Sequence, residues 1–189
     1  MDGMTLEAPT QTRPGGRSAR VRAAVHRAAQ ELLAGGPADA LTIPLIAAGA
    51  GVHPTTVYRR WGTLGELLAD VASSRFSGGL VVPDTGSLRG DLEQWAAGVA
   101  TDLRDPKTLA IMRAAIGAAG VEGGSACVAD RHEQLEAMLE RARCAGETDV
   151  PDREQAADAL LGPLYYRAIF GEQPGSPAWA RGLVPRLLG

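Results

Sequence analysis

Apolar residues recur every three or four positions through most of this 189-residue chain, and this spacing predicts helices rather than strands. From Arg20 to Leu33 the apolar positions line one side of a helix, which a Gly-Gly-Pro sequence then ends. The same spacing predicts further helices over residues 42–50, 54–61, 63–74, 87–103, 105–119, 126–143, 151–170 and 177–188. Aromatic residues make up only 4% of the chain and β-branched runs are short, so we expect an all-α protein.

The region over residues 42–68 has the order of a helix-turn-helix followed by a supporting helix. Thr42 is a suitable N-cap for a short apolar helix. Gly51 stands where the chain must reverse, and glycine accepts a positive φ at little cost. Pro54 suits the first turn of the second helix. Thr63 begins a capping-box pattern, which predicts the start of the third helix.

A helical wheel divides residues 54–61 into a buried side and an outward side. Val57 and Trp61 fall together on the buried side. Residues on the outward side are predicted to read base edges in a major groove, and they are Thr55, Thr56 and Arg59. Tyr58 and Arg60 lie on the two flanks, where a helix meets the phosphate walls of the groove. A small three-helix packing unit with a solvated polar face is the alternative interpretation.

Charge is distributed unevenly along the chain. The formal net charge is −3, yet seven arginines stand against two acidic residues over residues 13–61, so the remainder is acidic. A basic head on an acidic body is typical of a DNA-binding module with a separate function behind it, and chance segregation is the alternative. Residues 1–17 are rich in Thr, Pro and Gly, and we expect a disordered basic arm there. Such an arm either lies along a minor groove or is an idle solvated tail.

These features divide the chain into three parts. The arm over residues 1–17 precedes a helix-turn-helix DNA-binding domain over 18–76, and a larger helical domain for ligand binding and dimerisation covers 87–189. A loop rich in glycine separates the head from the body. A second glycine-rich loop is predicted over residues 120–125.

The last two predicted helices carry more apolar surface than a monomer of this size covers. From Ala156 to Ile169 few positions are polar around the whole helix, and such a helix must be covered on all sides. The terminal helix adds Trp179 and four further apolar residues. Two helices from each of two subunits would bury these surfaces, which predicts a homodimer. An ordinary buried helix in a monomer is the alternative.

The sequence contains no arrangement typical of an enzyme or a metalloprotein. Cys127 and Cys144 suggest neither a disulfide framework nor a metal site, and the three histidines have no ligand spacing. No nucleophile–base pair and no phosphate-binding glycine loop is present. No apolar run has the length of a membrane span. We therefore expect a soluble, cytoplasmic protein without a metal or cofactor.

Residues 18–75 resemble the DNA-binding domain of the tetracycline-repressor (TetR) family of bacterial transcriptional regulators. The residues that carry the resemblance are Ile46-Ala47, Ala50-Gly51-Val52, Thr56-Val57-Tyr58, Trp61 and Glu66-Leu67-Leu68. The resemblance implies phosphate contacts for Thr42 and Tyr58. Family members often carry a phosphate-binding lysine near the start of the fourth helix, which here has none, so the Thr63 hydroxyl or the helix N-terminus takes that contact. His53, before the second helix, completes the candidate DNA-binding set.

The stretch from Leu160 to Leu188 resembles, more loosely, one of the C-terminal domain variants of the same family. The family likeness implies that the body binds a small molecule that resets the spacing of two heads. Candidate lining residues lie on helices able to face one central cavity, and they are Trp95, Met112, Gly117, Met138, Tyr166 and Phe170. Few charged residues lie on the inward faces, so the ligand is expected to be apolar or weakly polar. Ordinary core packing of the same residues is the alternative.

We therefore expect a dimeric, sequence-specific transcriptional regulator that binds a palindromic double-stranded DNA operator. A repressor released by a small effector is the form that the resemblance favours. A DNA-binding regulator that senses no small molecule is one alternative. A helical enzyme with an incidental DNA-like head is the other.

Overall fold

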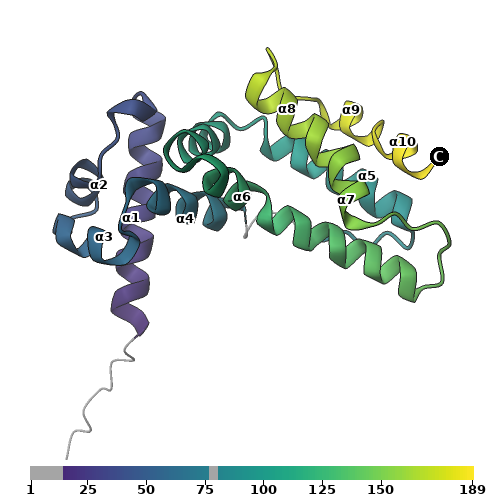
Figure 1. Ribbon diagram of the computed structural model, residues 1–189, viewed down its shortest axis with the longest axis horizontal. Coiled ribbons are helices and arrows are strands. Elements are labelled where there is room, and N and C mark those ends of the chain that lie inside the picture. The colour runs from purple at the N-terminus through teal and green to yellow at the C-terminus, as the bar shows by residue number, and fades with distance from the viewer. Residues whose placement is uncertain (1–14, 77–80) are drawn as a thin grey trace, which may run out of the picture.

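The computed structural model describes residues 15–76 and 81–189, and every regular element within these ranges is helical. The predicted all-α fold is confirmed. Most of the predicted arm, residues 1–14, lies outside the described ranges, as do loop residues 77–80. Residues 15–17 were assigned to the arm, and this is wrong, because α1 begins at Gly15. Figure 1 shows a head formed by the first four α-helices and a longer body beside it.

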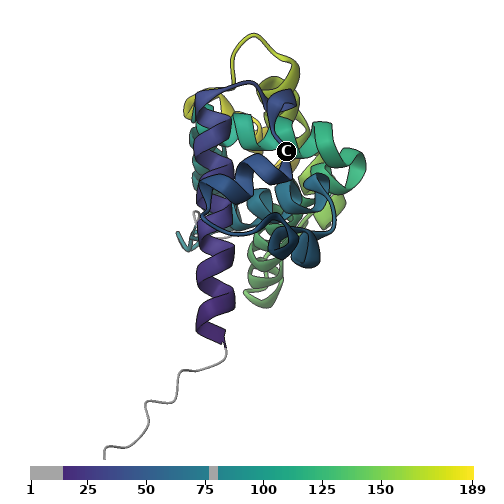
Figure 2. The ribbon, with the colours of Figure 1, turned by 90° about the vertical axis from the view of Figure 1, so that its left-hand side faces the viewer.

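The head has one short 3₁₀ turn and four α-helices: α1 (Gly15–Gly35), η1 (Ala38–Ala40), α2 (Ile43–Gly49), α3 (Pro54–Trp61) and α4 (Leu64–Phe76). Helix α1 is the longest of these and runs past the other three in Figures 1 and 2. Its Val25 and Ala29 are fully buried, together with Ile46 of α2, Val57 of α3 and Leu67 of α4. Burying each large aliphatic side chain contributes about 1.5–3 kcal/mol. One small core therefore holds all four helices together.

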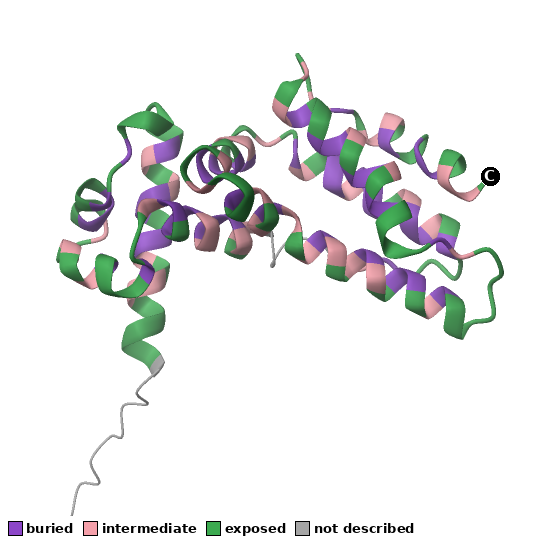
Figure 3. Ribbon diagram, viewed as in Figure 1, coloured by how far each residue is buried: buried purple, intermediate pink, exposed green. Residues whose placement is uncertain are grey.

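The body consists of the remaining elements: α5 (Leu88–Asp102), α6 (Pro106–Cys144), α7 (Arg153–Ala156), the π-helical turn η2 (Ala157–Leu161), α8 (Gly162–Phe170), α9 (Pro177–Arg181) and α10 (Val184–Leu188). Their inward faces are buried and their outer faces exposed, as the alternating colours in Figure 3 show. Trp95 of α5, Leu135 and Met138 of α6, and Leu160 of η2 are fully buried. The core of the body therefore lies between α5, α6 and the helix that begins at α7.

The predicted glycine-rich loop over residues 120–125 is wrong. Helix α6 continues through this stretch with one break, at Gly120, where φ is 54° and ψ is −123°. Only glycine adopts that conformation at low cost, so a single residue makes the change of direction seen in Figure 1. Gly123 is buried, and a Cβ there would overlap the carbonyl oxygen of Ala115. Close packing across the break thus keeps the glycine-rich stretch helical despite its low helix propensity.

The two predicted C-terminal helices are interrupted. The helix expected over residues 151–170 begins at Arg153 and contains a wide π-helical turn directly before Gly162. Pro163 lacks an N–H, and this wider turn lies where that missing donor disturbs the ordinary helical ladder. The terminal helix expected over 177–188 is instead the two short helices α9 and α10, and Pro185 lies in the first turn of the second.

The head and the body meet where α4 packs against α6. A Cβ placed on the buried Gly65 of α4 would lie 2.8 Å from the carbonyl oxygen of Ala118 and 3.1 Å from the Cβ of Ala119. Near the other end of α4, Arg75 donates to the Asp105 carboxylate with a nitrogen–oxygen distance of 3.1 Å. Asp105 is also the N-cap of α6. The head is therefore fixed to both ends of the first half of α6.

Candidate nucleic-acid interface

Helices α2 and α3 and the turn between them have the predicted helix-turn-helix geometry. Thr42 caps α2, and its Oγ1 accepts a hydrogen bond from the Leu45 N–H at 3.4 Å. Gly51 has a φ of 65° in the turn, which confirms the need for glycine there. His53 is the N-cap of α3, where its Nδ1 accepts from the Thr55 N–H at 3.3 Å. These caps fix where α3 begins and which way its first turn faces.

Helix α3 divides into faces as the wheel predicted. Val57 and Trp61 are buried, which confirms the inward side. Exposed side chains make up most of the rest of the helix, and they are Thr55, Tyr58, Arg59 and Arg60. Thr56 is half-buried. The outward face of α3 is therefore polar and carries two arginines.

A hollow of about 720 Å³ lies between the start of α1 and α3. Its lining combines three arginines with smaller side chains: Arg17, Ser18, Val21, Val52, His53, Thr56, Arg59 and Arg60. The Arg60 side chain extends toward α1, where its Nη1 donates to Ser18 Oγ at 2.7 Å. This basic groove extends the polar face of α3 onto α1.

Sequence reasoning missed Arg17 and Ser18, because it placed Arg17 in the arm and began the helix at Arg20. The signal was present, since Arg17 lies one helical turn before Val21 and continues the spacing of α1. Four predicted residues do not line the groove: Thr42, Thr55, Tyr58 and Thr63. Thr55 and Tyr58 are exposed elsewhere on α3, and Thr42 and Thr63 are exposed at the starts of α2 and α4. Thr63 Oγ1 accepts from the Glu66 N–H at 3.1 Å, as the capping-box pattern predicted.

One carboxylate holds the end of α3 to two other helices. The Trp61 indole N–H donates to Asp70 Oδ2 on α4 at 2.8 Å. From α1, Arg22 donates to both carboxylate oxygens, at 2.6 and 3.0 Å, and the His26 Nε2 lies 2.9 Å from Oδ2. Arg22 lies 48 positions from Asp70 in the sequence, and sequence reasoning did not bring these residues together. This cluster sets the orientation of α3 relative to α1 and α4.

The cluster lowers the pKa values of Asp70 and His26 for different reasons. Burial alone would raise the pKa of Asp70, but hydrogen bonds from Arg22, Trp61 and His26 outweigh it and hold this pKa well below its usual range. Burial lowers the pKa of His26, against the opposing effect of the Asp70 carboxylate. At neutral pH the cluster therefore pairs an ionised Asp70 with Arg22 beside a neutral His26.

The structure does not gather the predicted ligand-binding residues around one cavity. Trp95, Met112 and Met138 are fully buried in the body, whereas Gly117 is exposed on the outside of α6. Tyr166 and Phe170 are 66% and 73% exposed, and their rings lie 5.6 Å apart. These last three residues therefore lie outside the core, because α6 and α8 turn them away from it. Of the hollows described in this structure, none is lined by the three buried residues.

The core of the body also contains a buried charge. Arg131 of α6 is 1% exposed and pairs with Asp102 at the end of α5 at 2.6 Å. Gln134 Oε1 accepts from both Arg131, at 3.0 Å, and the Trp95 indole N–H, at 2.9 Å. This network joins α5 to the second half of α6 through polar contacts.

Over residues 15–76 and 81–189, no helix combines the length and apolarity that a bilayer span requires. The same ranges contain no group of three or more His, Cys, Asp or Glu side chains placed to hold a metal ion.

Both parts of the molecule match known families. Residues 26–71 match the family of bacterial regulatory proteins called tetR, and residues 82–187 match the tetracyclin repressor-like C-terminal domain. The chain belongs to the TetR family. The resemblance carried by the helix-turn-helix is thereby confirmed.

TetR-family relatives match over most of the chain. YdeS of Bacillus subtilis, an uncharacterized HTH-type transcriptional regulator, is 29% identical over 168 residues, which cover 85% of this chain and 84% of YdeS. AqdR of Rhodococcus erythropolis, also an HTH-type transcriptional regulator, is 28% identical over 156 residues, which cover 79% of this chain and 74% of AqdR. The crystal structure of the TetR family transcription regulator SCO0332 aligns with a TM-score of 0.70 at 28% identity, over 89% of this chain and 97% of that one.

These relatives are regulators, and this TetR-family chain is a helix-turn-helix transcriptional regulator rather than an enzyme. The alternative of a helical enzyme is thereby excluded. The polar face of α3 lies within residues 26–71, which match the tetR family, and the basic groove beside it extends from there onto the start of α1.

Proposed function

We propose that the protein binds a palindromic operator as a homodimer, represses transcription there and is released by a small effector. The outward face of α3 is the observation that carries the DNA-binding part. Val57 and Trp61 are buried on one side of α3. Its hydrogen-bonding side chains therefore lie on the opposite side, where a bound duplex would contact them. A major groove admits one α-helix in this manner.

Within this proposal each residue of the interface has a role. Thr55, Thr56 and Arg59 read base edges, and Arg59 is suited to a bidentate bond with guanine. Phosphate contacts fall to residues on the flanks of α3 and at the helix starts, and these are Thr42, His53, Tyr58, Arg60 and Thr63. Arg17 joins them, because it lines the same basic groove as Arg60.

Paired substitutions on α3 test the DNA-binding roles. Arg59→Ala should cost about 1–3 kcal/mol of binding free energy on a preferred duplex and relax the preference at one base pair. Arg60→Ala should weaken binding to all duplexes alike and reduce the slope of log K against log salt by about one. Fluorescence anisotropy with a preferred and a random duplex measures both. Equal weakening on the two duplexes by Arg59→Ala would contradict base reading.

The exposed aromatic pair on α8 supports the dimer. Tyr166 and Phe170 lie one helical turn apart on the outward side of α8, and contiguous exposed apolar surface of this kind marks an interface. The C-terminal helices α9 and α10 follow in the chain and lie, like α8, along the upper side of the body in Figure 1. An isologous contact between two copies would cover both rings at once.

The effector part is supported by membership of the TetR family and by the contacts between head and body. Because Gly65 and Arg75 of α4 touch both ends of the first half of α6, we expect a change in the body to be transmitted to the head through these contacts. A ligand releases DNA only if it binds more tightly to the arrangement in which the heads no longer match the operator. An apolar ligand among Trp95, Met112 and Met138 would have to displace packed side chains.

A further inference from the structure

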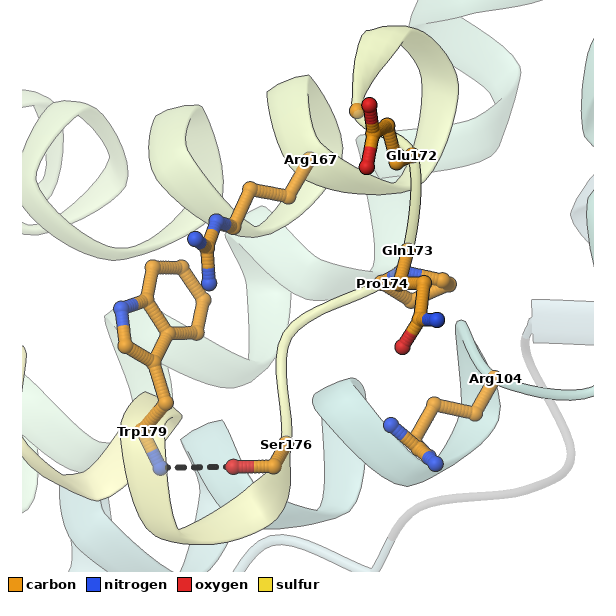
Figure 4. Close-up of a pocket in the computed structure, with 8 residues that line it drawn as sticks. Arg104, Arg167, Glu172, Gln173, Pro174, Ser176 and Trp179 are labelled. Atoms are coloured by element: carbon orange, nitrogen blue, oxygen red, sulfur yellow. Dashed lines mark hydrogen bonds between the residues drawn. The ribbon is translucent and has the colours of Figure 1, made fainter.

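A hollow of about 520 Å³ lies in the body between the α5–α6 turn and the segment that joins α8 to α9 (Figure 4). Its volume is within the usual range of small-molecule sites. The side chains that give it chemical character are Arg104, Arg167, Glu172, Gln173, Ser176 and Trp179. None of them was a predicted site residue.

Two arginines in this hollow carry no described carboxylate partner. Over residues 15–76 and 81–189 the arginine ion pairs are formed by Arg22, Arg75, Arg131, Arg141 and Arg143. Arg104 and Arg167 form none of them, although both side chains line the hollow. Guanidinium groups match the planar geometry of a carboxylate and bond it through two parallel N–H donors. Both guanidinium groups are therefore available to bind an anion.

One of these arginines is held in place by an aromatic ring. The Arg167 guanidinium lies 4.6 Å from the centroid of the Trp179 ring, a cation–π distance. Figure 4 shows Arg167 directed at this ring and Arg104 entering from the other side of the α8–α9 segment. Ser176 accepts from the Trp179 backbone N–H at 3.1 Å, which fixes the start of α9 beneath the ring. A positioned guanidinium loses less side-chain entropy on binding an anion than a mobile one.

The charge and shape of the lining narrow the class of ligand. Two guanidiniums and the Glu172 carboxylate leave the hollow with one net positive charge, which matches a ligand with a single negative charge. Pro174 provides apolar surface in the hollow, and Arg167 lies over the Trp179 ring. We propose that this hollow binds a small planar monocarboxylate, with its carboxylate attracted by Arg104 and Arg167 and its apolar part against Pro174.

The site lies one residue from the contact between body and head. Arg104 precedes Asp105, whose carboxylate pairs with Arg75 of α4 at 3.1 Å. Arg167 is also next to Tyr166 on the outward side of α8, so the hollow borders the surface proposed for the dimer. Control of DNA affinity by the bound acid rests on the proposed function, whereas binding of the acid does not.

Titration calorimetry of the full-length protein with benzoate tests the site. Wild-type protein should bind benzoate, and Arg104→Gln and Arg167→Gln should each weaken binding by about tenfold or more, because a charge-assisted hydrogen bond is lost. Arg89→Gln is the matched control, since Arg89 is exposed at the far end of α5, and it should bind as wild type does. Benzoate should also change the tryptophan fluorescence, and Trp179→Phe should abolish that change.

Several results would overturn the proposal. Absence of benzoate binding at millimolar concentrations would do so, as would equal weakening by Arg89→Gln. If benzyl alcohol bound as tightly as benzoate, the arginines would not be contributing to affinity through the carboxylate. If inorganic phosphate bound as tightly, the hollow would not be selective for a planar carboxylate. Thermal melting curves verify that each variant is folded. DNA affinity is measured in parallel: benzoate that binds without altering it would uphold the site and overturn only its regulatory role.

Discussion

At the scale of single residues, Asp70 does most to organise the DNA-binding head. Its two oxygens receive donors from Arg22, His26 and Trp61, so one carboxylate ties α1 and the end of α3 to α4. Each charged hydrogen bond of this kind contributes about 1.5–3 kcal/mol. The sequence showed Trp61 as a buried residue, but its polar partner comes from tertiary packing and has no local pattern.

The stability of the head should fall as the pH drops. Because burial lowers the pKa of His26, the unfolded chain takes up this proton at a higher pH than the folded chain does. The free energy of unfolding therefore decreases below about pH 6.5. The pKa of Asp70 is also lowered, so its contribution persists above about pH 4 and is lost only as the pH falls further. Urea unfolding at a series of pH values measures both effects.

A pair of histidine variants isolates the first effect. His26→Gln should remove the loss of stability between pH 6.5 and the lowered pKa of His26. His132→Gln should leave it in place, because His132 lies on the partly exposed side of α6. An unchanged pH dependence in His26→Gln would show that His26 is not the titrating group.

At the scale of helices, the helix caps and the buried face of α3 could be predicted from the sequence, whereas the breaks within the longer helices could not. Thr42, Gly51 and Thr63 were identified correctly because a cap or a turn depends on neighbouring residues alone. A loop was predicted over residues 120–125 because glycine is a poor helix former. Packing against the preceding half of α6 instead keeps the residues after Gly120 helical. The outward direction of Tyr166 was missed for a related reason, since composition does not reveal which side of an apolar helix faces the core.

The contact between α4 and α6 should tolerate no side chain at Gly65. Gly65→Ala would place a methyl group 2.8 Å from the Ala118 carbonyl oxygen, which forces the two helices apart. We expect a loss of about 1–3 kcal/mol in the free energy of unfolding, measured by urea denaturation. Gly117→Ala is the control, because nothing lies within 4 Å of a Cβ there, and it should be neutral or stabilising. Equal effects of the two substitutions would contradict tight packing at this contact.

At the scale of the whole molecule, the proposed dimer is the arrangement that covers the exposed aromatic pair. Tyr166→Glu with Phe170→Glu would place two charges at its centre, and like charges facing across an isologous contact repel. The double variant should sediment as a folded monomer at micromolar concentration, where wild type sediments as a dimer. Val121→Glu is the control, since Val121 is 81% exposed on α6 outside this surface. A wild-type chain that sediments as a monomer would contradict the proposal.

Two heads fixed in one dimer must meet two half-sites. Successive major grooves on one side of a duplex are about 34–36 Å apart, and a two-fold protein requires a palindromic sequence. Charge supports this arrangement, because the basic groove of Arg17, Arg59 and Arg60 lies on the head, while the body is acidic and carries the surface proposed for the dimer.

Selection of bound duplexes from a random DNA pool by the full-length protein, followed by sequencing, is the most direct test of the central claim. The claim is that two copies of α3 read an operator together. It predicts enrichment of one palindrome whose half-sites are centred about one helical turn, or a multiple of it, apart. Arg59→Ala should lose the preference at one position in each half-site. Enrichment of a single unpaired half-site, or of no sequence at all, would contradict it.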